Sequence, residues 1–304
     1  MPQTFLPFSC ICSSDTMALR LLNAYVHAKK YLVNPRQLVD DVIRFGPLST
    51  SQWLLANLGV KTYTRTSYPI VDLKVTTLFD GTWKRIERGE IELNCIKRLS
   101  EVVKQGDTVF DIGSWHGTYT LLISHLVGKS GRVIAFEPVP EVRGVLGDNV
   151  RKNSMTNVKV EPFCLSNSVG EVTIHIDSAG GTTSSIVSNQ LISKGQDISI
   201  PCTTVDKYCK DCDIWPTGMK LDVEGAEGLV IEGCREVIQR CHPWVLLEFH
   251  GQLFSEDQRK ANWEKLTQSA KEIIFVDGEG TSLGYGARLR EMPDCTYFHA
   301  FLQY

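Results

Sequence analysis

The chain has 304 residues, of which 42% are hydrophobic and 22% are charged, a balance typical of soluble globular proteins. Its formal net charge of -3 gives no global positive field that would gather nucleic acid or anionic lipid, although a local basic patch stays open. No apolar run reaches the ~20 residues that span a bilayer, and the N-terminus lacks the basic segment of a secretory signal. We therefore expect a cytoplasmic protein without a membrane span.

The first part of the chain has helical periodicity. An apolar helix face runs through Leu21 and Tyr25, and a second helix is expected between Pro35 and Gly46. These signals predict a small helical appendage over residues 1–80. It either packs on the main domain, which we favour, or serves as a substrate lid or dimer contact.

From about residue 105, strand-like and helical segments alternate, which predicts a parallel sheet with helices on both faces in a domain of residues 81–304. The expected strands are Thr108–Ile112, Val133–Phe136, Val158–Pro162, Met219–Val223, Val245–Phe249, Ile273–Val276 and Thr296–Leu302. The expected helices are Thr118–Val127, Glu141–Lys152, Ala226–Arg240 and Ser255–Ser269. An added β-hairpin is expected from Glu171–Ile176 and Ile198–Thr203.

Ten cysteines are scattered along the chain and favour small buried positions in a reduced protein. Cys209 and Cys212 form a CxxC pair, a spacing that serves as half of a zinc site or as a redox pair in other proteins. No second CxxC or HxxxH pair stands at metal-ligand spacing. We therefore expect no bound metal at this pair.

A glycine-rich turn follows the first expected strand, in the sequence Asp111-Ile-Gly113-Ser114-Trp-His-Gly117. Glycine lets the backbone approach a ligand closely. The turn lacks the GxGxxG pattern of dinucleotide-binding proteins. In addition, an acid at this point would repel the pyrophosphate of a dinucleotide. A carboxylate here favours a ligand with a cationic amino-acid end. S-adenosylmethionine is such a ligand, because it carries an ammonium and a sulfonium group and no phosphate. The alternative is an ordinary strand–turn–helix corner.

A second acid ends the next strand, in Val133-Ile-Ala-Phe-Glu137-Pro138. An acid at this place in a Rossmann-like sheet can accept hydrogen bonds from both ribose hydroxyls. Pro138 ends the strand and fixes the direction in which the carboxylate points. The alternative is a solvated surface glutamate, which the spacing from the glycine turn makes less favoured.

Charged residues alternate along the fourth strand, in Lys220-Leu-Asp222-Val-Glu224-Gly-Ala-Glu. Because side chains two residues apart share a strand face, Lys220, Asp222 and Glu224 are expected on one face. Buried charges need partners or a function, and ligands in open α/β sheets lie at the carboxyl ends of strands. A buried structural Lys–Asp pair is the alternative.

The fifth strand ends in Leu246-Leu-Glu-Phe-His250. His250 is a candidate general base because the ordinary pKa of histidine lies near neutrality, and a structural histidine is equally compatible with the pattern. His116, inside the glycine turn, is a weaker candidate.

Together the segments VFDIGSWHGTYT, VIAFEP, CLSNSVGEVTIHI, TTVDKY and MKLDVEGAEGLVIEG resemble the FkbM-type family of S-adenosylmethionine-dependent methyltransferases, over about residues 85–250. The resemblance implies an α/β class I methyltransferase fold with a mostly parallel seven-stranded sheet. It also implies that S-adenosylmethionine lies at the ends of the first two core strands, and that a methyl group is transferred to oxygen.

By position, the resemblance assigns cofactor-binding roles to Asp111, Gly113, Gly117, Glu137, Ser166 and Asn167. Ser114, within the same glycine turn, is a further candidate for cofactor binding. It places Asp222 and Glu224 at the acidic end of the fourth strand, beside Lys220. The family has an alanine, an asparagine and an aliphatic residue where this chain has Ser114-Trp115-His116, so an amide side chain is missing from the turn.

We expect an O-methyltransferase that acts on a hydroxyl of a small molecule or glycan, with Asp222 or His250 as the base and Glu224 and Lys220 beside it. A divalent ion held by Asp222 and Glu224 is compatible with this pattern but is not required. Two alternatives stay open: a methyltransferase acting on protein or RNA, and a binding module without catalysis. No nucleic-acid partner is expected, and the oligomeric state is open.

Overall fold

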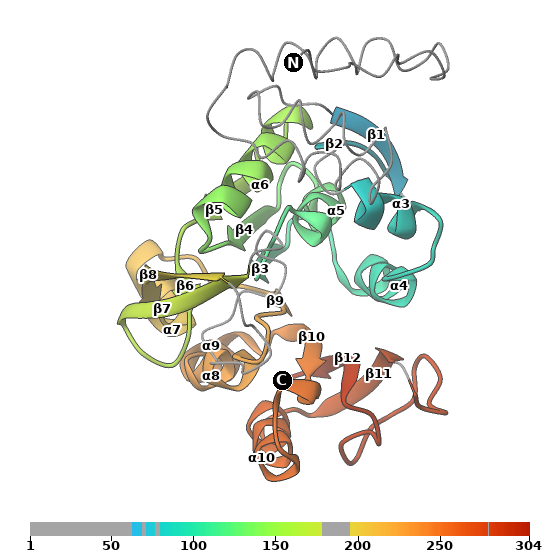
Figure 1. The fold of residues 1–304 in the computed structure, drawn as a ribbon, viewed down its shortest axis with the longest axis vertical. Helices are drawn as coiled ribbons and strands as arrows, with labels where there is room; N and C mark the ends of the chain where they lie inside the picture. The colour runs from blue at the N-terminus through green and yellow to red at the C-terminus, as the bar shows by residue number, and fades with distance from the viewer. Residues whose placement is uncertain (1–62, 69–70, 77–79, 178–194, 279) are drawn as a thin grey trace, which may run out of the picture. The chain divides into compact units, whose positions relative to one another are not determined.

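The structure, drawn in Figure 1, is a computed structural model that describes residues 63–68, 71–76, 80–177, 195–278 and 280–304. The chain divides into two compact units, residues 1–65 with 75–81 and residues 66–74 with 82–304. The helices expected before residue 60 lie outside the described residues. Within the expected helical appendage, two paired strands are described instead, β1 (Tyr63–Tyr68) and β2 (Val71–Thr76).

The larger unit is built on a seven-stranded sheet whose strand order is β11-β12-β10-β9-β3-β4-β5. Its strands in chain order are β3 (Thr108–Ile112), β4 (Arg132–Phe136), β5 (Val158–Glu161), β9 (Gly218–Leu221), β10 (Trp244–His250), β11 (Glu272–Gly278) and β12 (Tyr297–Gln303). Within this sheet β12 runs antiparallel to its two neighbours, and the remaining pairings are parallel. The seven strands expected from the sequence are confirmed, and so is the mostly parallel α/β class.

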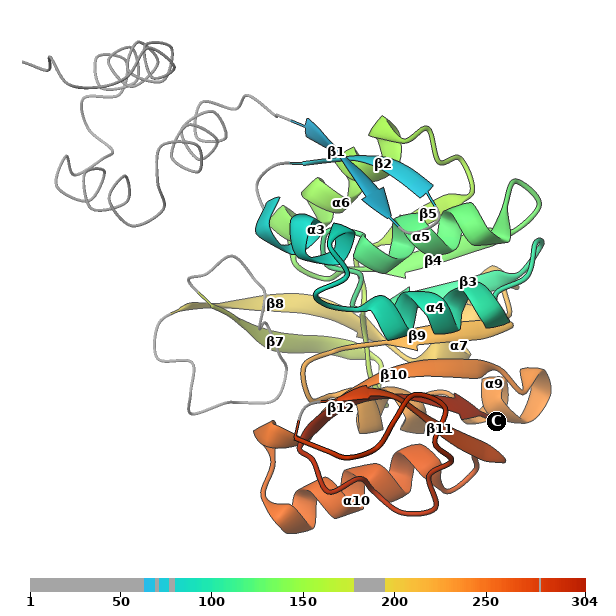
Figure 2. The same cartoon turned by 90° about the vertical axis from the view of Figure 1, so that its right-hand side faces the viewer.

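The helices of this unit are α3 (Asp80–Glu87), α4 (Leu93–Val102), α5 (Thr118–Val127), α6 (Pro140–Lys152), α7 (Val205–Cys212), α8 (Glu227–Glu232), α9 (Arg235–Cys241) and α10 (Glu256–Thr267). Figure 2 shows α4 and α5 on one side of the sheet and α7 on the other. None of the helices in the described ranges has the length and apolar character that a membrane span requires.

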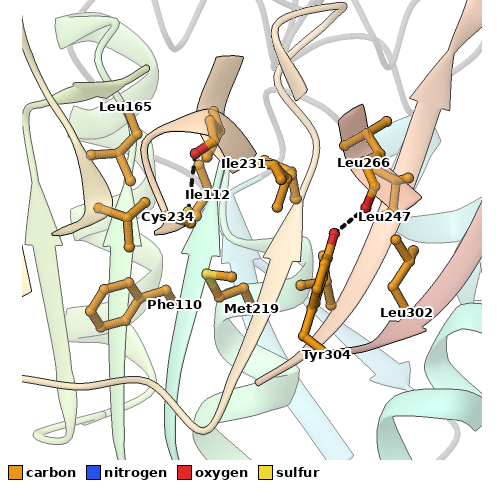
Figure 3. Close-up of a cluster of buried hydrophobic side chains, with 14 of the residues drawn as sticks. Phe110, Ile112, Leu165, Met219, Ile231, Cys234, Leu247, Leu266, Leu302 and Tyr304 are labelled. Atoms are coloured by element: carbon orange, nitrogen blue, oxygen red, sulfur yellow. Dashed lines mark hydrogen bonds between the residues drawn. The ribbon is translucent and has the colours of Figure 1, made fainter. Parts of the chain in front are cut away.

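The main hydrophobic core lies between the sheet and the helices α7 to α10. Phe110, Met219 and Leu247 of three neighbouring strands pack with Ile231 and Cys234 of the α8 region, as Figure 3 shows. At its edge the hydroxyl of Tyr304 donates a hydrogen bond to the carbonyl of Leu266. These strands are apolar on both faces except at their carboxyl ends, which is why buried polar groups gather there.

A second, three-stranded sheet interrupts the alternation, in the order β6-β8-β7. It consists of β6 (Cys164–Leu165), β7 (Gly170–Asp177) and β8 (Gly195–Thr203). Strands β7 and β8 pair antiparallel, which confirms the expected hairpin.

Two helical expectations differ from the structure. The single helix expected over Ala226–Arg240 is two short helices, α8 and α9, with a break at Gly233 and Cys234. A Cβ on Gly233 would lie 2.2 Å from the carbonyl oxygen of Ser166, so this point of the chain is pressed against the end of β6. Helices α3, α4 and α7 were not predicted from the sequence. Helix α10 begins with a capping box formed by Ser255 and Gln258.

Candidate active site

A cavity of about 350 Å³ lies at the carboxyl ends of β3, β4, β9 and β10, within the size range of small-molecule sites. Its walls include the glycine turn after β3, the end of β4, the start of the small sheet and the acidic end of β9. The residues from expected functional segments that line it are Gly113, Ser114, Glu137, Lys220, Asp222 and Glu224. The sequence motifs therefore converge on one cavity.

The glycine turn is packed directly against the end of β9. Gly113 has a backbone φ of 82°, and a Cβ at this position would lie 1.7 Å from the carbonyl oxygen of Asp222. Glycine is required here because no side chain fits between the two segments. Gly117, with φ of 94°, caps α5 and does not line the cavity.

Asp111 supports the turn from beneath. Its side chain is fully buried, and its Oδ2 accepts a hydrogen bond of 2.5 Å from Thr120 in α5. The Oδ1 atom has no hydrogen-bond partner among the described residues. Burial raises the pKa of this carboxyl, while the nearby Lys220 lowers it. Asp111 does not line the cavity, and its contact with the cofactor stays a prediction.

Glu137 joins the ends of β3 and β4. Its Oε2 accepts a hydrogen bond of 2.9 Å from the backbone N–H of Trp115, and its Oε1 accepts one of 2.9 Å from Val139. The side chain borders the cavity and is almost fully buried. Burial raises its pKa to about 7, against the lowering effect of these two N–H donors.

Two residues in the cavity wall have unusual backbone conformations. Trp115 has φ of 47° and Glu224 has φ of 53°, both in the left-handed region that residues other than glycine seldom adopt. Strained backbone of this kind gathers at functional sites. The ring of Trp115 also packs on that of His116, with centroids 3.8 Å apart.

A buried polar cluster lies on the sheet face that α4 and α5 cover. Asp111 pairs with Lys220 across β3 and β9, and Lys220 pairs with Leu246 across β9 and β10. Because side chains alternate, Asp222 and Glu248 come next on the same face of their strands. The polar residues of neighbouring strands therefore form one contiguous group.

Lys220 lies at the centre of this cluster and is 3% exposed. Its Nζ is 2.6 Å from Oδ2 of Asp222 and 4.0 Å from Oε2 of Glu248, and it lies over the ring of Tyr119. Burial alone would lower the pKa of Lys220, but the carboxyls around it raise the pKa above the ordinary value. Lys220 therefore stays charged at neutral pH.

His250 extends the cluster from the end of β10. Its Nδ1 lies 3.1 Å from Oε1 of Glu227, and its Nε2 lies within 4 Å of oxygens of Asp222, Glu224 and Glu248. Burial lowers the pKa of His250, but these carboxyls raise it to about 10. His250 is not in the cavity wall, and its role as a base stays a prediction.

Three further members of the cluster were not identified in the sequence. Tyr297 of β12 donates a hydrogen bond of 2.5 Å to Oε1 of Glu248, and His299 lies 3.4 Å from Oε2 of the same carboxyl. Glu92 accepts a hydrogen bond from Tyr119 and lies 3.7 Å from His299. In the sequence, the two-residue spacing of Tyr297 and His299 places their side chains on one face of the last strand. This spacing indicates membership of the cluster only when the pairing of β12 with β10 is known.

Ser166 and Asn167 do not line the cavity. The backbone N–H of Ser166 donates to Thr203, and the side-chain amide of Asn167 donates to Glu232 over 2.9 Å. They connect β6 to β8 and α8. The residues just before them, Phe163, Cys164 and Leu165, form the cavity wall instead.

The remaining sequence candidates lie elsewhere. His116 is buried, and burial lowers its pKa to about 3, so it is neutral at physiological pH. Cys209 and Cys212 are free thiols in α7, the first buried and the second exposed. Neither belongs to a group of metal-binding side chains within the described residues.

Comparisons with known proteins connect this geometry to a family. The model of the methyltransferase FkbM domain matches residues 111–297 of the chain. The chain is 38% identical over 58 residues to the protein-L-isoaspartate O-methyltransferase of Methanococcus aeolicus, covering 19% of this chain and 27% of that protein. It is 29% identical over 99 residues to the ribosomal RNA large subunit methyltransferase E of Blochmanniella pennsylvanica, covering 32% and 47%. The chain thus spans less than half the length of these curated relatives.

Two solved structures illustrate the structural likeness. The methyltransferase FkbM of Methylobacillus flagellatus aligns with 16% identity and a TM-score of 0.41, over 74% of this chain and 55% of that chain. Fibrillarin of Aeropyrum pernix, with natively bound S-adenosyl-L-methionine, aligns with 15% identity and a TM-score of 0.40, over 68% and 72%. The family assignment rests on the domain match, which covers more than half of the chain. This chain belongs to the FkbM family of methyltransferases, whose cofactor is S-adenosylmethionine.

Proposed function

We propose that this protein transfers the methyl group of S-adenosylmethionine to a hydroxyl oxygen of a small molecule or glycan. One observation carries the proposal. A single cavity is bordered on one side by the glycine turn and Glu137, and on the other by the carboxyls of Asp222, Glu224 and Glu248. A cofactor pocket and a group that can accept a proton therefore share one space.

The residues of the cavity fit the cofactor. A carboxylate has about four lone-pair sites, and Glu137 uses two of them on backbone N–H groups. It can therefore accept two further hydrogen bonds from the ribose hydroxyls. The apolar side chains of Phe136, Val139, Phe163 and Leu165 line the same cavity and suit an adenine ring. We assign the ribose contact to Glu137 and the methionine end to the turn at Gly113 and Ser114.

When bound, S-adenosylmethionine supplies a methyl group on sulfonium sulfur, and attack by a hydroxyl oxygen in line forms the C–O bond as the C–S bond breaks. The protein must hold the acceptor and remove one proton. Orientation alone can contribute ~7–11 kcal/mol. We assign proton removal to Asp222, whose Oδ2 is held by Lys220 and whose side chain borders the cavity. Lys220 and His250 then act as positioning residues.

A second candidate function is methylation of RNA. The pairing of Lys220 with Asp222 resembles the Lys/Asp arrangement of ribose methyltransferases, and one partial relative is named a ribosomal RNA methyltransferase. The formal net charge of -3 favours the small-molecule acceptor over a polyanion. The expectation that no nucleic acid is a partner stays a prediction, as do the cytoplasmic location and the role of the first 80 residues.

Transfer of a radiolabelled methyl group tests the proposal. Purified protein is incubated with labelled S-adenosylmethionine and separate panels of glycans, alcohols and phenols, RNA, and protein. We expect label in alkali-stable ethers of small hydroxyl compounds or glycans, and a loss of about 100-fold or more in Asp222→Asn, the range for removal of a general base. Asp211→Asn, an exposed surface change in α7, is the control.

Other results would overturn it. Label confined to RNA would favour the second candidate, and label in protein carboxyls or amines would point to a protein substrate. Cofactor binding without transfer across all panels would leave a binding module without catalysis.

A further inference from the structure

The imidazole of His250 is fixed in orientation by a carboxylate behind it. Its Nδ1 lies 3.1 Å from Oε1 of Glu227, and the two side chains are both buried. Glu227 in turn accepts the backbone N–H of Gly225 over 3.0 Å, which holds the carboxyl in place. A carboxylate on one ring nitrogen is the arrangement that orients histidine ligands toward metal ions.

The other ring nitrogen, Nε2, lies among carboxylate oxygens of three side chains. It lies 3.5 Å from Oε2 of Glu224, 3.7 Å from Oε1 of Glu248 and 3.9 Å from Oδ1 of Asp222. His250 is 4% exposed, so Nε2 lies in the interior of the cluster. Two ligands ~2.1 Å from one cation are ~3.0 Å apart at a right angle and ~4.2 Å apart when opposite. The observed separations fall between these limits.

The oxygens that face His250 are not the ones that Lys220 holds. Lys220 takes Oδ2 of Asp222 and approaches Oε2 of Glu248, which leaves Oδ1 and Oε1 directed at the imidazole. Tyr297 donates to Oε1 of Glu248 and His299 approaches Oε2, so this carboxyl is fixed from two sides. Both carboxyls are thus oriented by neighbours while one oxygen of each remains directed at Nε2.

Acidic groups outnumber basic ones around this point. The carboxyls of Asp222, Glu224, Glu227 and Glu248 surround it, with the ammonium of Lys220 and the imidazole of His250, whose pKa they raise to about 10. A divalent cation at Nε2 would take the place of the proton that His250 holds, because a histidine ligand must be unprotonated. Buried carboxylates in excess are unfavourable unless a positive charge compensates them. Asp222, Glu224 and Glu248 also line the cavity, which gives an ion a route of entry and open coordination positions.

We propose that Nε2 of His250, Oδ1 of Asp222 and Oε1 of Glu248 bind one first-row divalent cation at the wall of the cavity. The three side chains place ligand atoms within 4.8 Å of one another. One imidazole with two carboxylates suits Mn²⁺, Fe²⁺, Co²⁺ or Zn²⁺ better than Ca²⁺, which prefers oxygen ligands alone. On the proposed function, the ion would bind the acceptor hydroxyl through a position open to the cavity and lower its pKa, and Asp222 would then assist proton removal by holding the ion.

Metal binding is measured without cofactor or acceptor, so its result does not depend on whether the protein transfers methyl groups. Full-length protein is treated with a chelator and titrated with Mn²⁺, with free Mn²⁺ followed by electron paramagnetic resonance. We expect one Mn²⁺ per chain, and binding weakened by at least about 10-fold in both His250→Gln and Asp222→Asn. The side chain of Asp222 is more exposed than that of His250, so we expect Asp222→Asn to disturb folding less than His250→Gln.

Two controls locate the ion. Glu256→Gln, an exposed acid at the start of α10, should bind Mn²⁺ as the parent does. Cys95→Ser tests the neighbouring group Glu92, Cys95 and His299, which also brings ligand atoms together. Co²⁺ absorption distinguishes the groups, because a cobalt–thiolate band would report Cys95. Absence of Mn²⁺ binding, unchanged binding in His250→Gln and Asp222→Asn, or loss of binding in Cys95→Ser would each overturn the proposal.

Discussion

The carbonyl oxygen of Asp222 occupies the space where Gly113 would carry a Cβ, with a separation of 1.7 Å. The glycine turn and the acidic strand end are therefore in direct backbone contact. A change in one of these segments must displace the other, which couples the proposed cofactor turn to the proposed catalytic carboxyl.

Gly113→Ala tests this contact. The added methyl group would meet backbone and force a left-handed φ on alanine, so we expect a loss of stability of about 2–4 kcal/mol. Gly144→Ala is the matched control, because Gly144 is an exposed glycine within α6 with nothing within 4 Å of its Cβ position. It should gain about 0.5–1 kcal/mol. Urea unfolding measures both, and equal effects in the two variants would contradict the packing described here.

Lys220→Met tests the balance of charge in the buried cluster. Removing the ammonium leaves Asp222 and Glu248 without their shared cation, so we expect a loss of about 3–5 kcal/mol. Lys260→Met, which breaks an exposed pair with Glu256, should cost less than about 1 kcal/mol. Unfolding by urea at neutral pH compares the two, and a small loss in both would show that the cluster is not stabilised by Lys220.

The pH dependence of stability tests the environment of Glu137. Its pKa in the folded protein is raised to about 7, above the ordinary value of about 4.5 for the unfolded chain. Between these values the folded protein holds a proton that the unfolded chain has released, so raising the pH favours unfolding. The stability from this group is complete below about pH 4.5 and is lost by the time the pH passes about 7.

Glu137→Gln removes this dependence because an amide does not ionise. We therefore expect the stability of the parent, relative to the variant, to fall between pH 5 and pH 8, as measured by urea unfolding at both values. The comparison cancels other titrating groups that the two proteins share. A difference that stays constant with pH would show that Glu137 ionises with an ordinary pKa.

Much of the fold could be predicted from the sequence, because the strands of the central sheet are short apolar runs with clear boundaries. The hairpin of β7 and β8 was predictable for the same reason. The break between α8 and α9 was not, since it depends on the approach of Gly233 to Ser166, a contact between distant parts of the chain. Apolar periodicity continues through Gly233, so the sequence alone favours one helix.

The candidate site also contains residues that could be predicted from the sequence and residues that could not. Glu137 and Asp222 could be proposed because acids at the ends of apolar strands are conspicuous and parallel strands end at one edge of a sheet. Tyr297 and His299 could not, because they belong to the last strand and meet Glu248 only through its antiparallel pairing with β10. Ser166 also illustrates the limit, because its distance from the cavity depends on the path of β6.

Calorimetric titration with S-adenosylmethionine tests the central claim most directly, that Glu137 holds the ribose of the cofactor in the cavity. We predict one binding site of micromolar affinity in the parent and in Glu141→Ala, an exposed control on α6, with no binding of NAD. Glu137→Ala should bind about 100-fold more weakly, because hydrogen bonds to a charged group contribute about 1.5–3 kcal/mol each. Equal affinity in a folded Glu137→Ala variant and the parent would contradict the account, and so would binding of NAD in place of the adenosyl ligand.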